Sequence, residues 1–125
     1  MQIGRAVAMA LSKEQRAIAR CYKQPGYFLS TYARIYDATQ REWIPFGLWP
    51  AQVDALATLQ QQRQTVILKA RQLGLSWLTL GYALWLMLFH PAAAVLFFSR
   101  RDEEAKYMLS DERLRGMFTR LPEWL

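Results

Sequence analysis

Residues 69–76 form the segment whose residue types best suit phosphate chemistry. The segment reads Lys-Ala-Arg-Gln-Leu-Gly-Leu-Ser, and it joins a short apolar run to a long uncharged stretch with the pattern of a helix. Backbone N–H groups at a helix N-terminus bind phosphate oxygens. A glycine lets the chain approach such a ligand closely, and a hydroxyl can ligate Mg²⁺. Gly74 and Ser76 would provide the glycine and the hydroxyl.

The segment matches the phosphate-loop pattern G-x-x-x-x-G-K-[ST] only in part. Lys69 stands where the pattern has its first glycine, and Leu75 stands where it has lysine. Either Lys69 or Arg71 could provide the displaced cation, and an ordinary strand-to-helix turn is the alternative interpretation. We predict a nucleotide site made by the whole segment, with Ser76 as the Mg²⁺ ligand; its members are Lys69, Ala70, Arg71, Gln72, Leu73, Gly74, Leu75 and Ser76.

The first half of the chain carries signals for helices and a hairpin. Ser12 and Gln15 form a capping box, which predicts a helix ending near Lys23, before Pro25-Gly26. Residues 32–36 and 42–46 are expected to pair across a turn at residues 37–40. Pro50 suits the first position of a second helix, which apolar spacing extends to Gln62.

The second half alternates apolar runs with helical patterns. Residues 65–68 and 94–98 are short, continuous apolar runs typical of buried parallel strands. Between them, residues 76–89 predict an apolar helix, and Ser99 with Asp102 predicts the capped start of another that ends near Leu109. A last helix is expected over residues 111–118. Strand, helix and strand in this order predict a parallel βαβ core.

The composition indicates a packed core and a polyanion partner, and it argues against disulfide and multi-histidine metal sites. The 125 residues are 53% hydrophobic, enough for a packed core, and the net charge of +6 favours a polyanion partner. Cys21 is the only cysteine, which excludes a disulfide within the chain, and His90 is the only histidine, which argues against a multi-histidine metal site. Residues 72–99 carry no charge and could be long enough for a membrane span. His90-Pro91 interrupts the stretch, so we favour a buried helix and expect no membrane.

Several segments together resemble the large terminase subunits, the DNA-packaging motors of tailed double-stranded DNA viruses. Residues 66–77 resemble their deviant Walker A segment, and residues 46–52 resemble the adenine-recognition segment upstream of it. Residues 99–105 and 121–125 also resemble terminase segments. The resemblance implies that ATP and Mg²⁺ bind here, with the Gln52 amide at the adenine edge and with Phe46 or Trp49 stacked on the base.

The resemblance also implies an organisation and partners. Residues 1–45 would be an N-terminal extension of helix and hairpin. Residues 46–125 would be the start of an α/β, P-loop NTPase-like ATPase domain with a parallel βαβ core, cut before the Walker B carboxylates and without the nuclease domain. The full-length enzyme would be an ATPase that packages double-stranded DNA in the host cytoplasm, with the portal protein, the small terminase subunit and further copies of itself. This chain alone, with no catalytic residues, is expected to be inactive.

Three other functions fit parts of the sequence. A helicase-like ATPase would share the glutamine segment and the loop. A small basic membrane protein would use the uncharged stretch, and a nucleic-acid-binding module without catalysis would use the positive charge. Arg100 and Arg101 fit either a solvated helix start or contacts to DNA phosphates.

Overall fold

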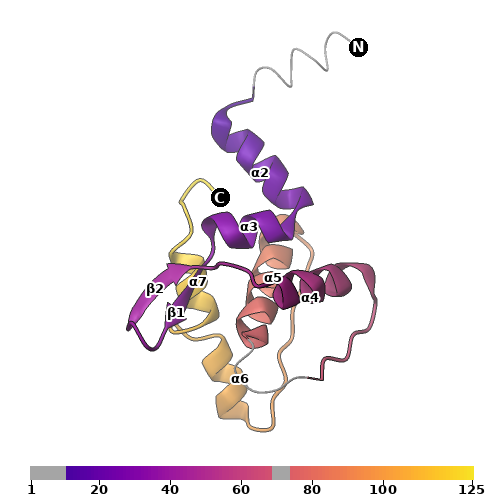
Figure 1. Cartoon of the computed structure of the whole chain (residues 1–125), viewed down its shortest axis with the longest axis vertical. Coiled ribbons are helices and arrows are strands. Elements are labelled where there is room, and N and C mark those ends of the chain that lie inside the picture. The colour runs from indigo at the N-terminus through magenta and orange to yellow at the C-terminus, as the bar shows by residue number, and fades with distance from the viewer. Residues whose placement is uncertain (1–10, 69–73) are drawn as a thin grey trace.

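The computed structural model describes residues 11–68 and 74–125. These residues are mostly helical, and their strands are those of one antiparallel hairpin (Figure 1). In chain order the elements are α2 (Lys13–Lys23), α3 (Pro25–Tyr32), β1 (Arg34–Asp37), β2 (Glu42–Pro45), α4 (Pro50–Gln61), α5 (Leu75–Phe89), α6 (Asp102–Met108) and α7 (Leu114–Thr119).

The predicted capping box at the first helix is confirmed. The Gln15 backbone N–H donates to the Ser12 hydroxyl at 3.1 Å, and the Ser12 N–H donates to the Gln15 side chain at 2.9 Å. The helix ends at Lys23 as expected, but Pro25 then opens a further helix, α3, that the sequence pattern did not indicate. A proline without an N–H is well tolerated at the first position of a helix, so Pro-Gly here begins an element as well as ending one.

The predicted hairpin is also confirmed, with each strand one residue shorter than expected and with β1 beginning two residues later. Ile35 pairs with Ile44, and Tyr36 pairs with Trp43. The Asp37 carboxylate accepts the Thr39 backbone N–H at 2.8 Å and so fixes the turn.

The predicted α/β fold with a parallel βαβ core is wrong. Within residues 11–68 and 74–125, neither 65–68 nor 94–98 belongs to a sheet. Val66 and Phe98 are 96% and 87% exposed, so these runs are not buried strands. A strand needs a hydrogen-bonded neighbour about 4.8 Å away, and apolar composition does not specify that neighbour.

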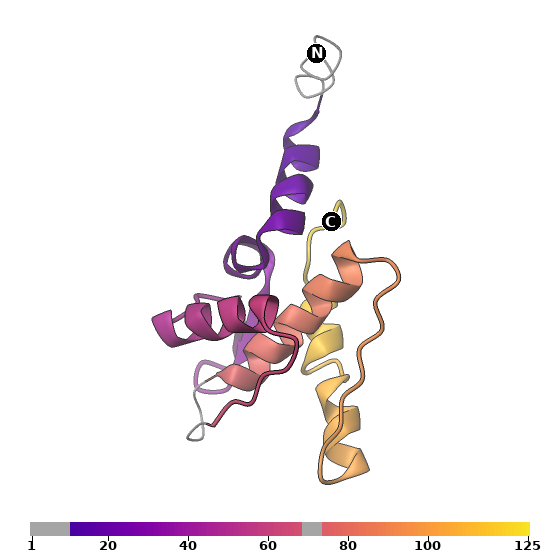
Figure 2. The same cartoon turned by 90° about the vertical axis from the view of Figure 1, so that its right-hand side faces the viewer.

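Helices surround α5 in place of the expected sheet. α5 contacts α3, α4 and α7, and Figure 2 shows it crossing the centre of the molecule while α2 projects away at one end. A helix that is apolar on nearly all sides can be buried by other helices as well as by strands, which explains why its sequence did not distinguish the two cases. Phe28 packs against Phe89 of α5, and Leu29 and Met117 lie beside Gly81 of the same helix; all three are fully buried.

α5 has 15 residues, fewer than the ~20 that a bilayer requires. In the described ranges, no helix combines the length and the apolar character of a membrane span.

The predicted capping role of Ser99 is wrong. Arg101 is the N-cap residue of α6, and the Ser99 hydroxyl instead donates to the Glu104 carboxylate at 2.6 Å. The last predicted helix is present but begins at Leu114, three residues later than expected.

Candidate nucleotide-binding site

A hydrogen bond joins the glutamine segment to the end of the phosphate-loop segment. The Gln52 side-chain amide donates to the Gly74 carbonyl oxygen at 3.2 Å, across 22 residues of sequence. The Gln52 side-chain oxygen accepts the Trp49 backbone N–H at 2.9 Å. Gln52 is only 4% exposed, and it is the one buried polar side chain in the part of the chain that the structure describes. Both ends of the amide are therefore engaged, and they hold the starts of α4 and α5 together.

Gly74 has a backbone conformation that favours glycine. Its φ of 69° and ψ of 15° lie in the left-handed region, where a β-carbon crowds the following carbonyl. A β-carbon would also lie 2.6 Å from the Gln52 side-chain nitrogen. Glycine thus permits both the turn into α5 and the close approach of Gln52.

The N-terminus of α5 has the features of an anion site. The first N–H groups of a helix lack partners within it; here the Leu78 N–H makes the first helical bond, to the Gly74 oxygen at 3.1 Å. No side chain caps this end, and the first turn contains no acidic residue. The helix dipole therefore presents partial positive charge beside Gly74.

A cavity of about 710 Å³ opens beside this helix end. Trp49, Gln52, Gly74 and Trp77 line one part of it, and the hairpin lines the rest. The volume is within the range of small-molecule and cofactor sites. We call this space the hairpin cavity.

The two predicted base-stacking residues have different environments. Phe46 is 1% exposed and belongs to the core, whereas Trp49 is 55% exposed at the hairpin cavity. Only Trp49 therefore offers a ring face to a ligand in this arrangement. The Gln52 amide is predicted to bind an adenine edge. To do so, it would have to give up its hydrogen bonds to Gly74 and Trp49 and form new ones to the base.

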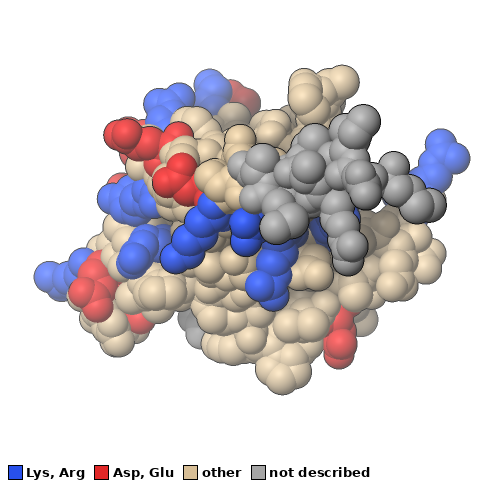
Figure 3. Space-filling model, turned by 90° about the horizontal axis from the view of Figure 1, so that it is seen from above, with Lys and Arg blue, Asp and Glu red and all other residues tan. Residues whose placement is uncertain are grey.

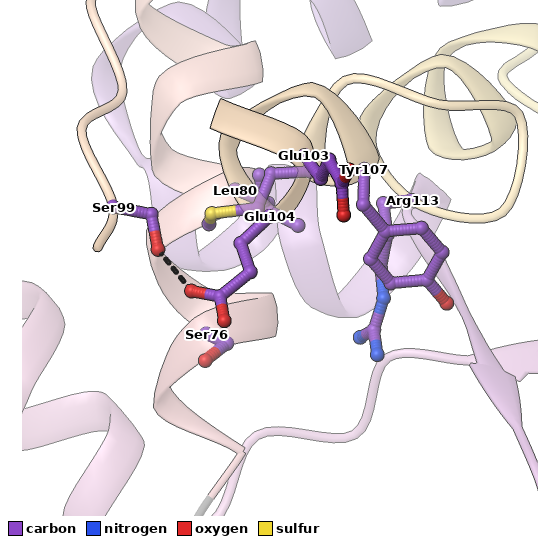
Figure 4. Close-up of a pocket in the computed structure, with 8 residues that line it drawn as sticks. Ser76, Leu80, Ser99, Glu103, Glu104, Tyr107 and Arg113 are labelled. Atoms are coloured by element: carbon purple, nitrogen blue, oxygen red, sulfur yellow. Dashed lines mark hydrogen bonds between the residues drawn. The ribbon is translucent and has the colours of Figure 1, made fainter. Parts of the chain in front are cut away.

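Ser76, the predicted Mg²⁺ ligand, faces a second cavity of about 420 Å³. Glu103 and Glu104 of α6 line this cavity, and Figure 4 shows the Glu104 carboxylate directed toward Ser99. A hydroxyl and carboxylates are the hard oxygen ligands that Mg²⁺ prefers, so the donor types fit the ion. No group of three or more His, Cys, Asp or Glu in residues 11–68 and 74–125 has the arrangement of a complete metal site.

The sequence pattern did not identify Glu103 and Glu104 as site residues, because acidic residues in the first turn of a helix are ordinarily explained by the helix dipole. Arg113 was also missed. Its guanidinium lies over the Trp77 ring, 4.5 Å from the centroid, and over the Tyr107 ring at 5.3 Å. It therefore brings a cation to the cavity that contains Ser76.

Five predicted site residues lie outside the described part of the chain: Lys69, Ala70, Arg71, Gln72 and Leu73. Leu75, the residue in the usual lysine position, is buried in the core at the start of α5. A cation for the phosphates therefore cannot come from that position.

Comparisons with protein-family models, with curated proteins and with solved structures found no match. The functional interpretation consequently depends on the site residues and on the sequence resemblance.

Proposed function

We propose that this chain is the ATP-binding, N-terminal part of a large terminase subunit, the motor ATPase that drives double-stranded DNA into a viral procapsid. The observation that carries the proposal is the hydrogen bond between Gln52 and Gly74. It connects the segment that resembles an adenine-recognition motif with the end of the segment that resembles Walker A. Two motifs that would act on one nucleotide are thus adjacent in space, although 22 residues separate them.

The triphosphate would lie at the N-terminus of α5, with its oxygens on the first backbone N–H groups. Trp49 would stack on the base from the hairpin cavity, and Lys69 or Arg71 would neutralise the phosphates. Gln52 would keep Gly74 in position, which makes it a positioning residue for the loop. The proposal includes no parallel sheet.

Mg²⁺ would be held by Ser76, and Glu103 and Glu104, the carboxylates that line the same cavity, are the candidate partners. Bound Mg²⁺ would neutralise phosphate charge. Turnover also needs a group that orients the attacking water, and we assign none in this chain. The chain would therefore bind ATP without hydrolysing it, and the full-length motor would work in the host cytoplasm with the portal protein, the small terminase subunit and further copies of itself.

Calorimetric titration of the purified chain with Mg·ATP tests the proposal. We expect Gln52→Ala to weaken ATP binding by about tenfold, the effect of losing about 1.4 kcal/mol. Gln60→Ala is the matched control, because Gln60 is an exposed glutamine on the same helix. Absence of ATP binding in the unsubstituted chain, or equal affinities for the two variants, would contradict the proposal.

The same titration tests whether Lys69 or Arg71 replaces the usual phosphate-loop lysine. Lys69→Ala and Arg71→Ala each remove one candidate, and we expect at least one of them to weaken ATP binding. If both variants bind as the unsubstituted chain does, the phosphates have no side-chain cation from this segment.

A further inference from the structure

Four cations form a stripe along α2. Lys13, Arg16, Arg20 and Lys23 are all exposed, and their spacing of three, four and three residues puts them on one side of the helix. The ten-residue separation between the first and the last corresponds to about 15 Å along the axis. We call these residues the basic stripe.

The basic stripe faces solvent on a helix that is anchored in the core at its last turn, by Cys21, and projects from the rest of the chain toward its N-terminus. α2 packs mainly on α3, and Figures 1 and 2 both show it projecting from the rest of the chain. Seen from the α2 end, Lys and Arg side chains gather across the middle of the molecule (Figure 3). Glu14 is the one acidic residue in α2, so the helix retains a strong positive charge.

A cavity of about 460 Å³ lies beside the stripe and has aromatic walls. Three cations line it, Lys13, Arg16 and Arg20, together with the carboxylate Glu14 and the rings of Tyr27, Tyr32 and Trp124. We call it the α2 cavity. It shares no residue with the hairpin cavity, so it has no part in the proposed ATP site.

The rings of the α2 cavity stand nearly perpendicular to one another. The Tyr32 and Trp124 centroids are 5.3 Å apart with an interplanar angle of 89°, and Tyr27 meets Tyr32 at 6.0 Å and 88°. Arg20 lies over the Tyr27 ring, 3.9 Å from its centroid. The cavity therefore combines ring faces with cations at its edge.

We infer that the α2 face binds single-stranded nucleic acid, with phosphates along the basic stripe and an unpaired base in the α2 cavity. Cations that follow the backbone, combined with aromatic rings that stack on bases, are the means by which single strands are bound without sequence preference. In a duplex the bases are already stacked and paired, so they cannot reach these rings. An acidic polypeptide would use the cations but would leave the three rings without a role.

The test measures binding of labelled oligothymidylate of about 12 nucleotides to the purified chain by fluorescence anisotropy, without ATP. Two further probes of equal length are an abasic strand, which keeps the phosphates and lacks the bases, and a duplex. We expect oligothymidylate to bind at least about fivefold more tightly than either, since one stacked base contributes about 1 kcal/mol or more. Equal binding of the strand and its abasic form would overturn the inference.

Variants separate the stripe from the cavity. Lys13→Ala with Arg16→Ala should lower the slope of log affinity against log salt by about 1.4, because each single-strand phosphate contact contributes about 0.7. Arg34→Ala with Arg63→Ala removes the same charge from exposed positions elsewhere and should leave the slope unchanged. Equal slopes for the two double variants would overturn the role of the stripe.

Trp124 tests base stacking. Trp124→Leu keeps an apolar side chain against Tyr32 but removes the ring, so it should reduce oligothymidylate affinity to that of the abasic strand. Trp124→Phe should restore binding. A loss in both variants with unchanged circular dichroism, or no loss in Trp124→Leu, would contradict the inference. Displacement of oligothymidylate by polyglutamate of equal charge as efficiently as by unlabelled oligothymidylate would instead identify an acidic polypeptide as the partner.

Discussion

The indole N–H of Trp85 donates a hydrogen bond to the Cys21 carbonyl oxygen at 2.7 Å, and this contact links the C-terminal half of α5 to the last turn of α2. Both residues are buried. Because 64 residues separate them, the bond secures the helix that carries the basic stripe to the centre of the core.

Trp85→Phe removes this donor and keeps an aromatic ring at the same position. We expect the free energy of unfolding to fall by about 1–3 kcal/mol, because a buried carbonyl loses a partner. Urea denaturation followed by circular dichroism measures the change. Trp49→Phe is the matched control, since Trp49 is more than half exposed, and a similar loss in the control would contradict a specific role for the buried bond.

Gly74→Ala should be costly for two reasons. The left-handed backbone disfavours a β-carbon by about 1–2 kcal/mol, and the added carbon would press on the Gln52 amide. We expect lower stability in urea and weaker ATP binding in calorimetry. A β-carbon at Gly47 would meet nothing within 4 Å, so Gly47→Ala is the control for stability, and an equal loss of stability in the two variants would argue against the strained turn.

Gly116→Ala should destabilise the chain although alanine normally stabilises a helix interior by about 1 kcal/mol relative to glycine. A β-carbon at Gly116 would collide with the Asp111 carbonyl oxygen and with the Trp43 ring. The hairpin would have to move away from α7, which thermal unfolding would report as a lower midpoint. Gly26→Ala serves as the comparison, because its β-carbon would make only an ordinary contact with Leu56 at 3.7 Å, and a higher midpoint for Gly116→Ala would contradict the prediction.

Cys21 should make stability depend on pH in the alkaline range. Burial raises the pKa of its thiol from 9.0 to about 11, and nearby Arg20 opposes the shift in part. The folded state therefore holds the proton more tightly than the unfolded state. This contribution is complete below pH 9 and is lost as the pH rises through about 11.

The unfolding free energy measured in urea between pH 8 and pH 11 checks this sign. Cys21→Ala should show a weaker decline than the unsubstituted chain. Iodoacetamide should also alkylate the native thiol slowly, because the side chain is fully buried and the thiolate is the reactive form. Equal declines for the two chains, or rapid alkylation under native conditions, would contradict the prediction.

Local signals in the sequence were enough to predict the elements that short-range chemistry controls. Ser12 and Gln15 predicted the start of α2, the Asp37 turn predicted the hairpin, and Pro50 predicted the start of α4. Each depends on hydrogen bonds or backbone constraints within a few residues. Gly74 was likewise identified as a special position, because it matches the last glycine of the phosphate-loop pattern.

The partners of the apolar runs depended on the tertiary structure. Residues 65–68 and 94–98 have the composition of buried strands, yet the described fold buries α5 with helices and leaves Val66 and Phe98 exposed. The contact of Gln52 with Gly74, and the contact of Trp124 with Tyr32 beside the basic stripe, are likewise long-range arrangements. The sequence alone shows which side chains need burial and which hydrogen bonds can form between residues close along the chain. The packing of the whole chain decides which distant segment buries an apolar run or satisfies a polar group.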